Sequence, residues 1–90
     1  MPEAEKVRYI ATCFSHYGAI RMKKLCEEHQ MQAALMPVPR FLSSSCGICV
    51  RYEGSRMCPV EEVPEEVERI YEKNGEREQD WTCVYEAEGL

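Results

Sequence analysis

The sequence has no stretch that approaches the about 20 consecutive apolar residues of a membrane-spanning helix, so we expect no membrane interaction. It also has no excess of basic residues, because 11 Lys and Arg stand against 16 Asp and Glu and give a net charge of −5. Phosphate binding needs a basic surface, so this charge argues against a general nucleic-acid-binding protein. The remaining composition, 44% hydrophobic and 30% charged, is that of a globular protein.

The N-terminus lacks the apolar core of a secretory signal, since residues 1–6 are mostly polar. A secreted chain with six cysteines in 90 residues would be expected to form three disulfides. Without a signal we expect a cytoplasmic location, where thiols stay reduced. Strand and helix patterns also fill most of the chain, which is not typical of a loop-rich disulfide scaffold.

The length predicts a single domain over residues 1–90, with a loose lead-in at 1–6 and a loose tail at 88–90. The first apolar run, which begins at Val7, is rich in β-branched and aromatic residues and is typical of a central strand. Ser15 follows it as a candidate N-cap of an amphipathic helix. The predicted elements are a strand at 7–14, a helix at 17–29, strands at 31–38 and 48–53, a helix at 61–73 and a strand at 81–87.

The helix expected at 61–73 rests on Val63, Val67, Ile70 and Tyr71, whose spacing would place them on one helical face. With this helix the element order becomes β-α-β-β-α-β. That order predicts an α+β, ferredoxin-like fold in which two helices cover one face of a four-stranded antiparallel sheet with strand order 4-1-3-2.

This topology would bring three connections to one end of the sheet. Cys13 and His16 at the start of the first helix would lie beside the loop at 40–49 and beside the charged loop at 76–80. Cys58 would lie at the opposite end. We therefore expect any chemistry to gather where the three connections meet.

The loop between the second and third predicted strands contains three consecutive serines followed by Cys46 and Gly47. We interpret Cys46 as the reactive residue, because a helix N-terminus together with Arg40 and His16 would lower its thiol pKa into a range of about 3.5–7.5. Gly47 would allow a sharp turn, and the serines, Ser45 among them, would donate hydrogen bonds to a terminal sulfur or selenium anion. The alternative is a flexible polar hairpin loop that holds a small buried cysteine.

Four groups of residues carry a family resemblance. They are Tyr9-Ile10 with Phe14-Ser15-His16 and Ala19, then Leu35-Met36-Pro37-Val38-Pro39-Arg40, then Ser43-Ser44-Ser45-Cys46-Gly47, and finally Arg51-Tyr52. Together they resemble the small bacterial family of selenium/sulfur carrier-like proteins over residues 7–75. The most specific part is the Pro-Val-Pro-Arg segment followed closely by Ser-Ser-Cys-Gly.

The resemblance implies that Cys46 carries sulfur as a persulfide, or selenium as the equivalent adduct. It extends to Gly47, Arg40 and Ser45 as residues around the adduct. It further implies a carrier rather than a turnover enzyme, with sulfur or selenium donor and acceptor proteins as partners, and we expect no cofactor and no bound metal. The chain departs from the family pattern at Cys49, where a small apolar residue is usual, and thereby forms a C-x-x-C with Cys46.

The C-x-x-C leaves a thiol–disulfide redox module as an alternative function. Three residues along a strand cover about 10 Å whereas a disulfide needs Cα atoms within about 7 Å, so Cys46 and Cys49 could pair only if Gly47 bends the chain before the strand. A zinc site completed by Cys13 and His16 is a further alternative, although structural zinc sites usually need two separated ligand pairs.

The last alternative is a binding module without chemistry. The open face of a ferredoxin-like sheet can bind partners, and two such domains could form a homodimer through it. Arg8, Arg51 and Glu86 would lie on that face, where such a mixture of charges is more typical of a solvated surface than of an interface.

Overall fold

The computed structural model describes residues 7–42, 44–54 and 63–88. Within these ranges the elements are β1 (Val7–Cys13), α1 (His16–Glu28), β2 (Gln32–Pro37), β3 (Ile48–Gly54), β4 (Val67–Lys73) and β5 (Trp81–Glu86). The predictions made for residues 1–6, for Cys58 and for the first two residues of the 61–73 helix lie outside the described residues.

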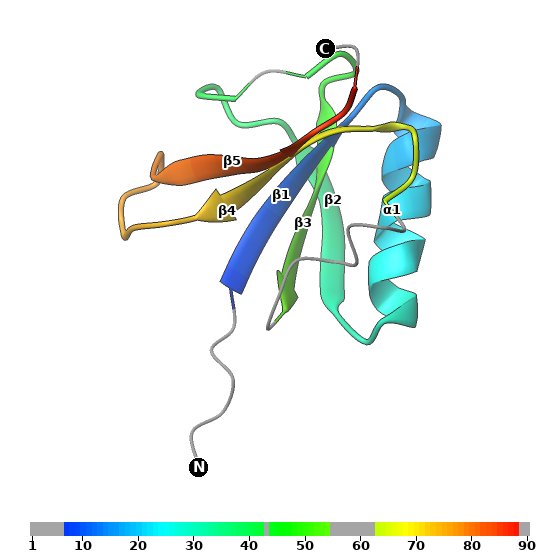
Figure 1. Ribbon diagram of the computed structural model, residues 1–90, viewed down its shortest axis with the longest axis horizontal. Helices are drawn as coiled ribbons and strands as arrows, with labels where there is room; N and C mark the ends of the chain where they lie inside the picture. Colours follow the sequence, from blue (N-terminus) through cyan, green and yellow to red (C-terminus); the bar gives the residue numbers. More distant parts are fainter. Residues whose placement is uncertain (1–6, 43, 55–62, 89–90) are drawn as a thin grey trace.

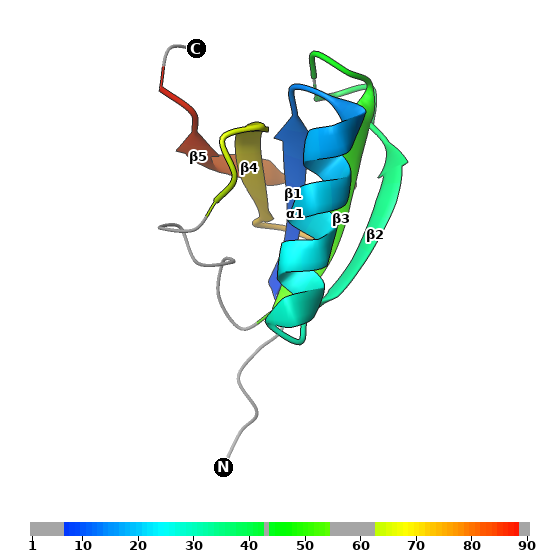
Figure 2. The same cartoon turned by 90° about the vertical axis from the view of Figure 1, so that its right-hand side faces the viewer.

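The strands form one five-stranded sheet in the order β2-β3-β1-β4-β5, and each neighbouring pair is antiparallel. Helix α1 packs along one face of this twisted sheet and contacts β1, β2, β3 and β4 (Figures 1 and 2). Ser15 caps the helix as predicted, because its Oγ accepts a hydrogen bond of 3.1 Å from the backbone N–H of Gly18.

The ferredoxin-like prediction is wrong, because the described ranges contain five strands and one helix instead of four strands and two helices. The segment expected to form most of the second helix is strand β4, which pairs with β1 on one side and with β5 on the other. The neighbours β2, β3 and β1 stand in the predicted order. Insertion of β4 beside β1 moves the last strand one place outward.

The spacing of apolar residues in β4 explains the error. Thr12 pairs with Arg69 and Cys13 pairs with Val67, so Glu68 is an extra residue that opposes no residue of β1. Such a β-bulge shifts the alternation of the strand by one position. Val67 and Ile70 therefore both reach the core with 0% exposure although they are three residues apart, which is the spacing of one helical face.

The direction of β4 changes which connections meet. Because β4 runs antiparallel to β1, its first residue Val67 lies at the Cys13 end, whereas Glu72 pairs with Tyr9 near the other end. The predicted place of the charged 76–80 loop beside the cysteine loop is therefore wrong. The β4–β5 hairpin that contains this loop projects from the opposite end of the sheet (Figure 1).

Both faces of the central strand β1 are buried. Tyr9, Ala11 and Cys13 belong to the core cluster under α1, together with helix residues such as Met22 and Cys26. Ile10 and Thr12, which alternate with them, are also at most 2% exposed. A strand buried on both faces is what its unbroken apolar sequence predicts.

Candidate functional site

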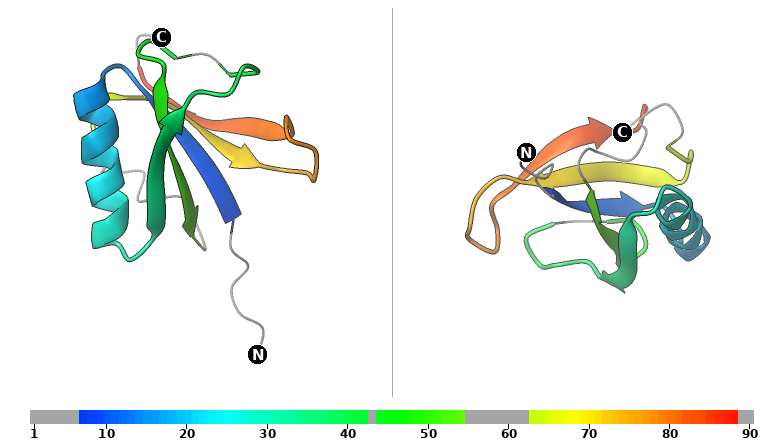
Figure 3. Two further views of the ribbon diagram at one scale, coloured as in Figure 1. Left: turned by 180° about the vertical axis from the view of Figure 1, so that it is seen from behind. Right: turned by 90° about the horizontal axis from the view of Figure 1, so that it is seen from below.

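The Cys46 loop, residues 38–47 except for the undescribed Ser43, joins β2 to β3. Its base is closed by the N–H of Val38, which donates to the carbonyl of Gly47 at 3.1 Å. The outward part of the loop extends away from α1, and its return passes the end of β1 (Figures 1 and 3). The returning residues Ser44, Ser45 and Cys46 consequently lie where β1 ends and β4 begins.

Serine side chains attach this return to the sheet. Ser44 Oγ donates to the carbonyl oxygen of Cys13 at 3.2 Å and accepts from the N–H of Cys46 at 3.3 Å. Ser45 donates twice to one carboxylate, from its N–H to Glu68 Oε1 at 3.1 Å and from its Oγ to Glu68 Oε2 at 2.7 Å. In this arrangement the hydroxyl protons of Ser44 and Ser45 hold the loop in place.

Sequence reasoning missed Glu68 as a site residue. Its neighbourhood in the sequence is rich in acids and is typical of an exposed helix surface, yet its side chain is only 5% exposed. The acid acquires its role from the β-bulge in β4. No local sequence signal indicates that role as long as the segment is read as a helix.

Cys46 has a partly exposed side chain, and its Sγ lies 3.4 Å from the carbonyl oxygen of Ile48. The next residue, Gly47, has a φ of +79° and bends the chain just before β3 begins. A Cβ at Gly47 would meet no atom within 4 Å, so glycine is favoured here by the backbone conformation and not by lack of space.

His16 connects the loop to the start of α1, of which it is the first residue. Its Nε2 lies 3.2 Å from the carbonyl oxygen of Cys46. Because a carbonyl oxygen only accepts hydrogen bonds, Nε2 carries the proton in this contact and is not placed to take one from the thiol. The start of α1 therefore lies beside the main chain of Cys46. This agrees with the prediction that the start of the first helix and the Cys46 loop lie together.

Arg40, the other predicted cation, is exposed on the outward part of the loop. Within the described part of the chain its guanidinium makes no hydrogen bond or ion pair with Cys46. Of the predicted site residues, the structure thus brings His16, Ser45 and Gly47 together with Cys46 through the loop backbone, and it leaves Arg40 apart from them.

Two further thiols, Cys13 and Cys49, lie close to the loop and are both 0% exposed. Burial, with a smaller contribution from the charge of Cys46, raises the pKa of Cys13 to about 12 and that of Cys49 to about 11. Cys49 Sγ lies 3.8 Å from the carbonyl oxygen of Pro37. The three thiols are close enough to interact electrostatically, and none of the five described cysteines is in a disulfide.

One protein-family sequence model, described as "Putative Se/S carrier protein-like", matches residues 8–77. The chain belongs to this family. The family resemblance expected from the sequence is thereby confirmed, and the matched range runs from β1 through β4 and includes the Cys46 loop. No curated protein and no solved structure shows significant similarity to the chain.

Membership of a Se/S carrier-like family implies donor and acceptor partners in general terms. The zinc alternative would need several ligands that converge, and no group of three or more His, Cys, Asp or Glu in residues 7–42, 44–54 and 63–88 is arranged to hold a metal ion. Helix α1, the one helix in these ranges, has neither the length nor the hydrophobicity of a membrane span.

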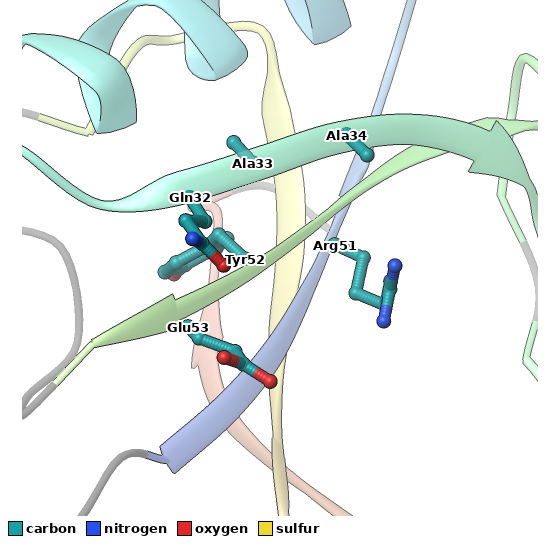
Figure 4. A pocket seen from close by; sticks show the side chains of 6 residues that line it. All are labelled: Gln32, Ala33, Ala34, Arg51, Tyr52 and Glu53. Carbon is teal, nitrogen blue, oxygen red and sulfur yellow. The ribbon is translucent and has the colours of Figure 1, made fainter.

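A separate hollow of this carrier-like protein lies along β2 and β3 (Figure 4). It has a volume of about 250 Å³. Its lining residues are Gln32, Ala33, Ala34, Arg51, Tyr52 and Glu53. Gln32 pairs with Glu53 at the end of β3 farthest from Cys46, so the hollow is not part of the cysteine site.

The charged residues expected on the open sheet face lie on the surface. Arg8 is 3.7 Å from Glu53, and Glu86 is 3.1 Å from Arg69. Exposed pairs of this kind contribute little to stability and are common on solvated surfaces. A homodimer through this face stays a prediction.

Proposed function

We propose that the protein carries sulfur or selenium on Cys46 as a persulfide-type adduct and passes it from a donor protein to an acceptor protein in the cytoplasm. The observation that supports this most directly is the contrast among neighbouring thiols. Cys46 is partly exposed on a loop held by hydrogen bonds, whereas Cys13 and Cys49 are buried. Only the first of the three can meet the sulfur of another protein without a change of fold.

Loading is a thiol exchange without net oxidation. The Cys46 thiolate attacks the terminal sulfur of a donor persulfide, and a bond forms between Cys46 Sγ and that sulfur as the donor S–S bond breaks. The electron pair of the broken bond leaves on the donor sulfur, which returns as a thiol after it takes up a proton. Selenium follows the same course when the donor holds it in an S–Se bond.

Unloading reverses these roles. An acceptor thiolate attacks the outer sulfur, the bond to Cys46 breaks, and Cys46 leaves as a thiolate. Arg40 is exposed and pairs with no carboxylate among the described residues, so we assign it the role of meeting negative charge on the incoming partner protein. His16 holds the carbonyl oxygen of Cys46, Ser45 fixes the preceding residue through its hydrogen bonds to Glu68, and Gly47 provides the bend.

Thiol–disulfide exchange between Cys46 and Cys49 is the second candidate, and the bend at Gly47 is the observation that favours it. Attack of Cys49 on Cys46 Sγ would form a disulfide and expel the outer sulfur as hydrosulfide. Burial keeps the Cys49 thiol protonated at neutral pH, because its pKa is raised to about 11. This second reaction therefore requires the loop to open first.

The test is intact-mass measurement after incubation with a cysteine desulfurase and L-cysteine. We expect a mass gain of one sulfur atom that is lost in Cys46→Ser and kept in Cys49→Ser. Cys83→Ser is the matched control, because Cys83 is a second exposed thiol, and Cys58→Ser covers the cysteine outside the described residues. A gain that persists in Cys46→Ser contradicts the proposal, and a Cys46–Cys49 disulfide found by peptide mapping without any gain favours the redox function.

A further inference from the structure

Glu68 is the one charged residue among the buried residues of the described chain. A buried carboxylate is unfavourable unless its oxygens accept hydrogen bonds. Both oxygens of Glu68 accept from a single residue of the Cys46 loop, Ser45, at 3.1 and 2.7 Å. The side chain of Glu68 is thus directed at the Cys46 loop, and both of its oxygens bind Ser45 there.

The backbone that carries Glu68 is held on two sides. Its neighbours Val67 and Arg69 pair with β1, and its own carbonyl oxygen accepts a hydrogen bond of 3.0 Å from the N–H of Ala87, just after β5. The bulge removes Glu68 from the ladder of pairs with β1, while the residues on both sides of it stay paired. The carboxylate is therefore presented to the loop from a fixed support inside the sheet.

The hydrogen bonds from Ser45 to Glu68 fix the residue that directly precedes Cys46. The N–H of Cys46 is held by Ser44, and its carbonyl oxygen is held by His16. We propose that Glu68 is a positioning residue for sulfur transfer, whose hydrogen bonds to Ser45 fix the loop so that Cys46 is presented to a persulfide held by another protein. This inference rests on the function proposed above.

A fixed loop matters for some donors and not for others. Transfer between two proteins requires the attacking and the attacked sulfur to approach to about 3–3.5 Å in one orientation, while both are attached to folded chains. A small reagent can approach the thiol from many directions. Loss of the Glu68–Ser45 contact should therefore slow loading by a protein donor much more than alkylation by a small molecule.

The effect of the charge of Glu68 on loading has to be distinguished from the effect of its hydrogen bonds. Both Glu66 and Glu68 raise the pKa of Cys13, so both act electrostatically on this end of the sheet. Glu66, however, is paired with Arg21 at 3.3 Å, and within the described chain its side chain makes no hydrogen bond or ion pair with the Cys46 loop. Glu66→Gln is therefore the matched control for loss of a nearby charge.

The experiment compares Glu68→Ala, Ser45→Ala, Ser45→Thr and Glu66→Gln with the unmodified chain. Three quantities are measured: the rate of loading from a persulfidated cysteine desulfurase, the rate of alkylation of Cys46 by iodoacetamide, and the hydrogen exchange of the Ser45 amide. We expect Glu68→Ala and Ser45→Ala to load about tenfold more slowly or worse, because a hydrogen bond to a charged acceptor is worth about that factor. Alkylation should be unchanged or faster, and exchange of the Ser45 amide should accelerate in Glu68→Ala.

Ser45→Thr keeps both donors and should load faster than Ser45→Ala, whereas Glu66→Gln should load like the unmodified chain. Ser45→Ala replaces only a loop side chain, so it keeps the test valid if Glu68→Ala fails to fold. Loading that is normal in both alanine variants, or that falls in parallel with alkylation, overturns the role of Glu68 alone. If the unmodified chain gains no sulfur, the proposed carrier function fails, and the role given to Glu68 fails with it.

Discussion

Cys46 and Cys83 offer a comparison of two accessible thiols in one small sheet. Each donates a weak hydrogen bond to the carbonyl oxygen two residues later, at 3.4 Å to Ile48 and at 3.3 Å to Tyr85. Cys83 is the more exposed of the two. If exposure and the immediate contact of the sulfur decided function, Cys83 would be at least as good a carrier.

The difference lies in what surrounds the main chain of each cysteine. The Cys46 loop is held by side chains from α1 and β4 and by a carbonyl of β1, whereas Cys83 lies on the outer strand of the sheet. Each region also contains a bulge residue, Glu68 in β4 and Val84 in β5. Glu68 is buried and holds the loop, while Val84 is 40% exposed. If Cys46 is the carrier thiol, as proposed, it is distinguished from Cys83 by the support around its main chain more than by its exposure.

The largest expected effect concerns the reactivity of the two buried thiols, Cys13 and Cys49, compared with that of the two accessible ones. With pKa values of about 11 and about 12, Cys49 and Cys13 should be only about 10⁻⁴ and 10⁻⁵ ionised at pH 7. Alkylation by iodoacetamide should therefore modify Cys46 and Cys83 at least about 100-fold faster than the two buried thiols. Peptide mapping by mass spectrometry measures this order, and rapid modification of Cys49 at neutral pH would show that the loop does not protect it.

The second effect is a loss of stability at alkaline pH to which the buried thiols beside the loop contribute. In the unfolded chain Cys49 ionises with a pKa of 9.0, whereas in the folded chain the pKa is raised to about 11. Between these values the unfolded state binds fewer protons, so the free energy of unfolding falls as pH rises, by at most about 1.4 kcal/mol per pH unit for each such thiol. Below pH 9 this contribution is fully present.

Urea unfolding followed by circular dichroism between pH 8 and pH 10.5 measures the slope. Cys49→Ala should make the decline shallower because one of the buried thiols is removed. Cys83→Ala should leave the slope unchanged because its thiol is exposed. Equal slopes in all three proteins would contradict the assignment of Cys49 to a buried, uncharged state.

The third effect tests the bend that precedes β3. Gly47→Ala should lower the free energy of unfolding by about 1–2 kcal/mol, because a side chain is unfavourable at a φ of +79°. Gly47→Asn should cost less, since asparagine tolerates this conformation better than alanine. Urea midpoints of the two variants provide the measurement, and a neutral Gly47→Ala would mean that the loop relaxes to another conformation.

The smallest expected effect is the change in stability on replacing Cys83, the accessible thiol on the outer strand. Cys83→Ser should change the free energy of unfolding by no more than about 0.5 kcal/mol, as is usual for exposed positions. Thermal and urea unfolding measure it directly. A larger loss would mean that β5 depends on this side chain in a way that its exposure does not indicate.

The same contrast explains what could be predicted from the sequence. The segment from β1 to β3, including the Ser15 cap and the loop with Cys46, follows from local patterns: β-branched runs, a capping serine and a polar turn with glycine. Strand β4 could not be predicted in this way, because its bulge gives Val67 and Ile70 the spacing of a helix. Glu68 was missed for the same reason, since its position in the site depends on pairing between strands far apart in the sequence.

The bulge also separates two requirements that usually compete at a buried position, namely the packing of the sheet and the contact that a side chain makes with a neighbouring loop. In a regular strand, a change of side chain alters either the packed face or the solvated face, and deletion of a residue reverses both faces. Glu68 belongs to no pair with β1, so its identity can vary while the alternation of Val67 and Ile70 is kept. Substitution at position 68 could thus change how firmly the Cys46 loop is held, and so which proteins reach its sulfur. The pairing of the sheet would be kept.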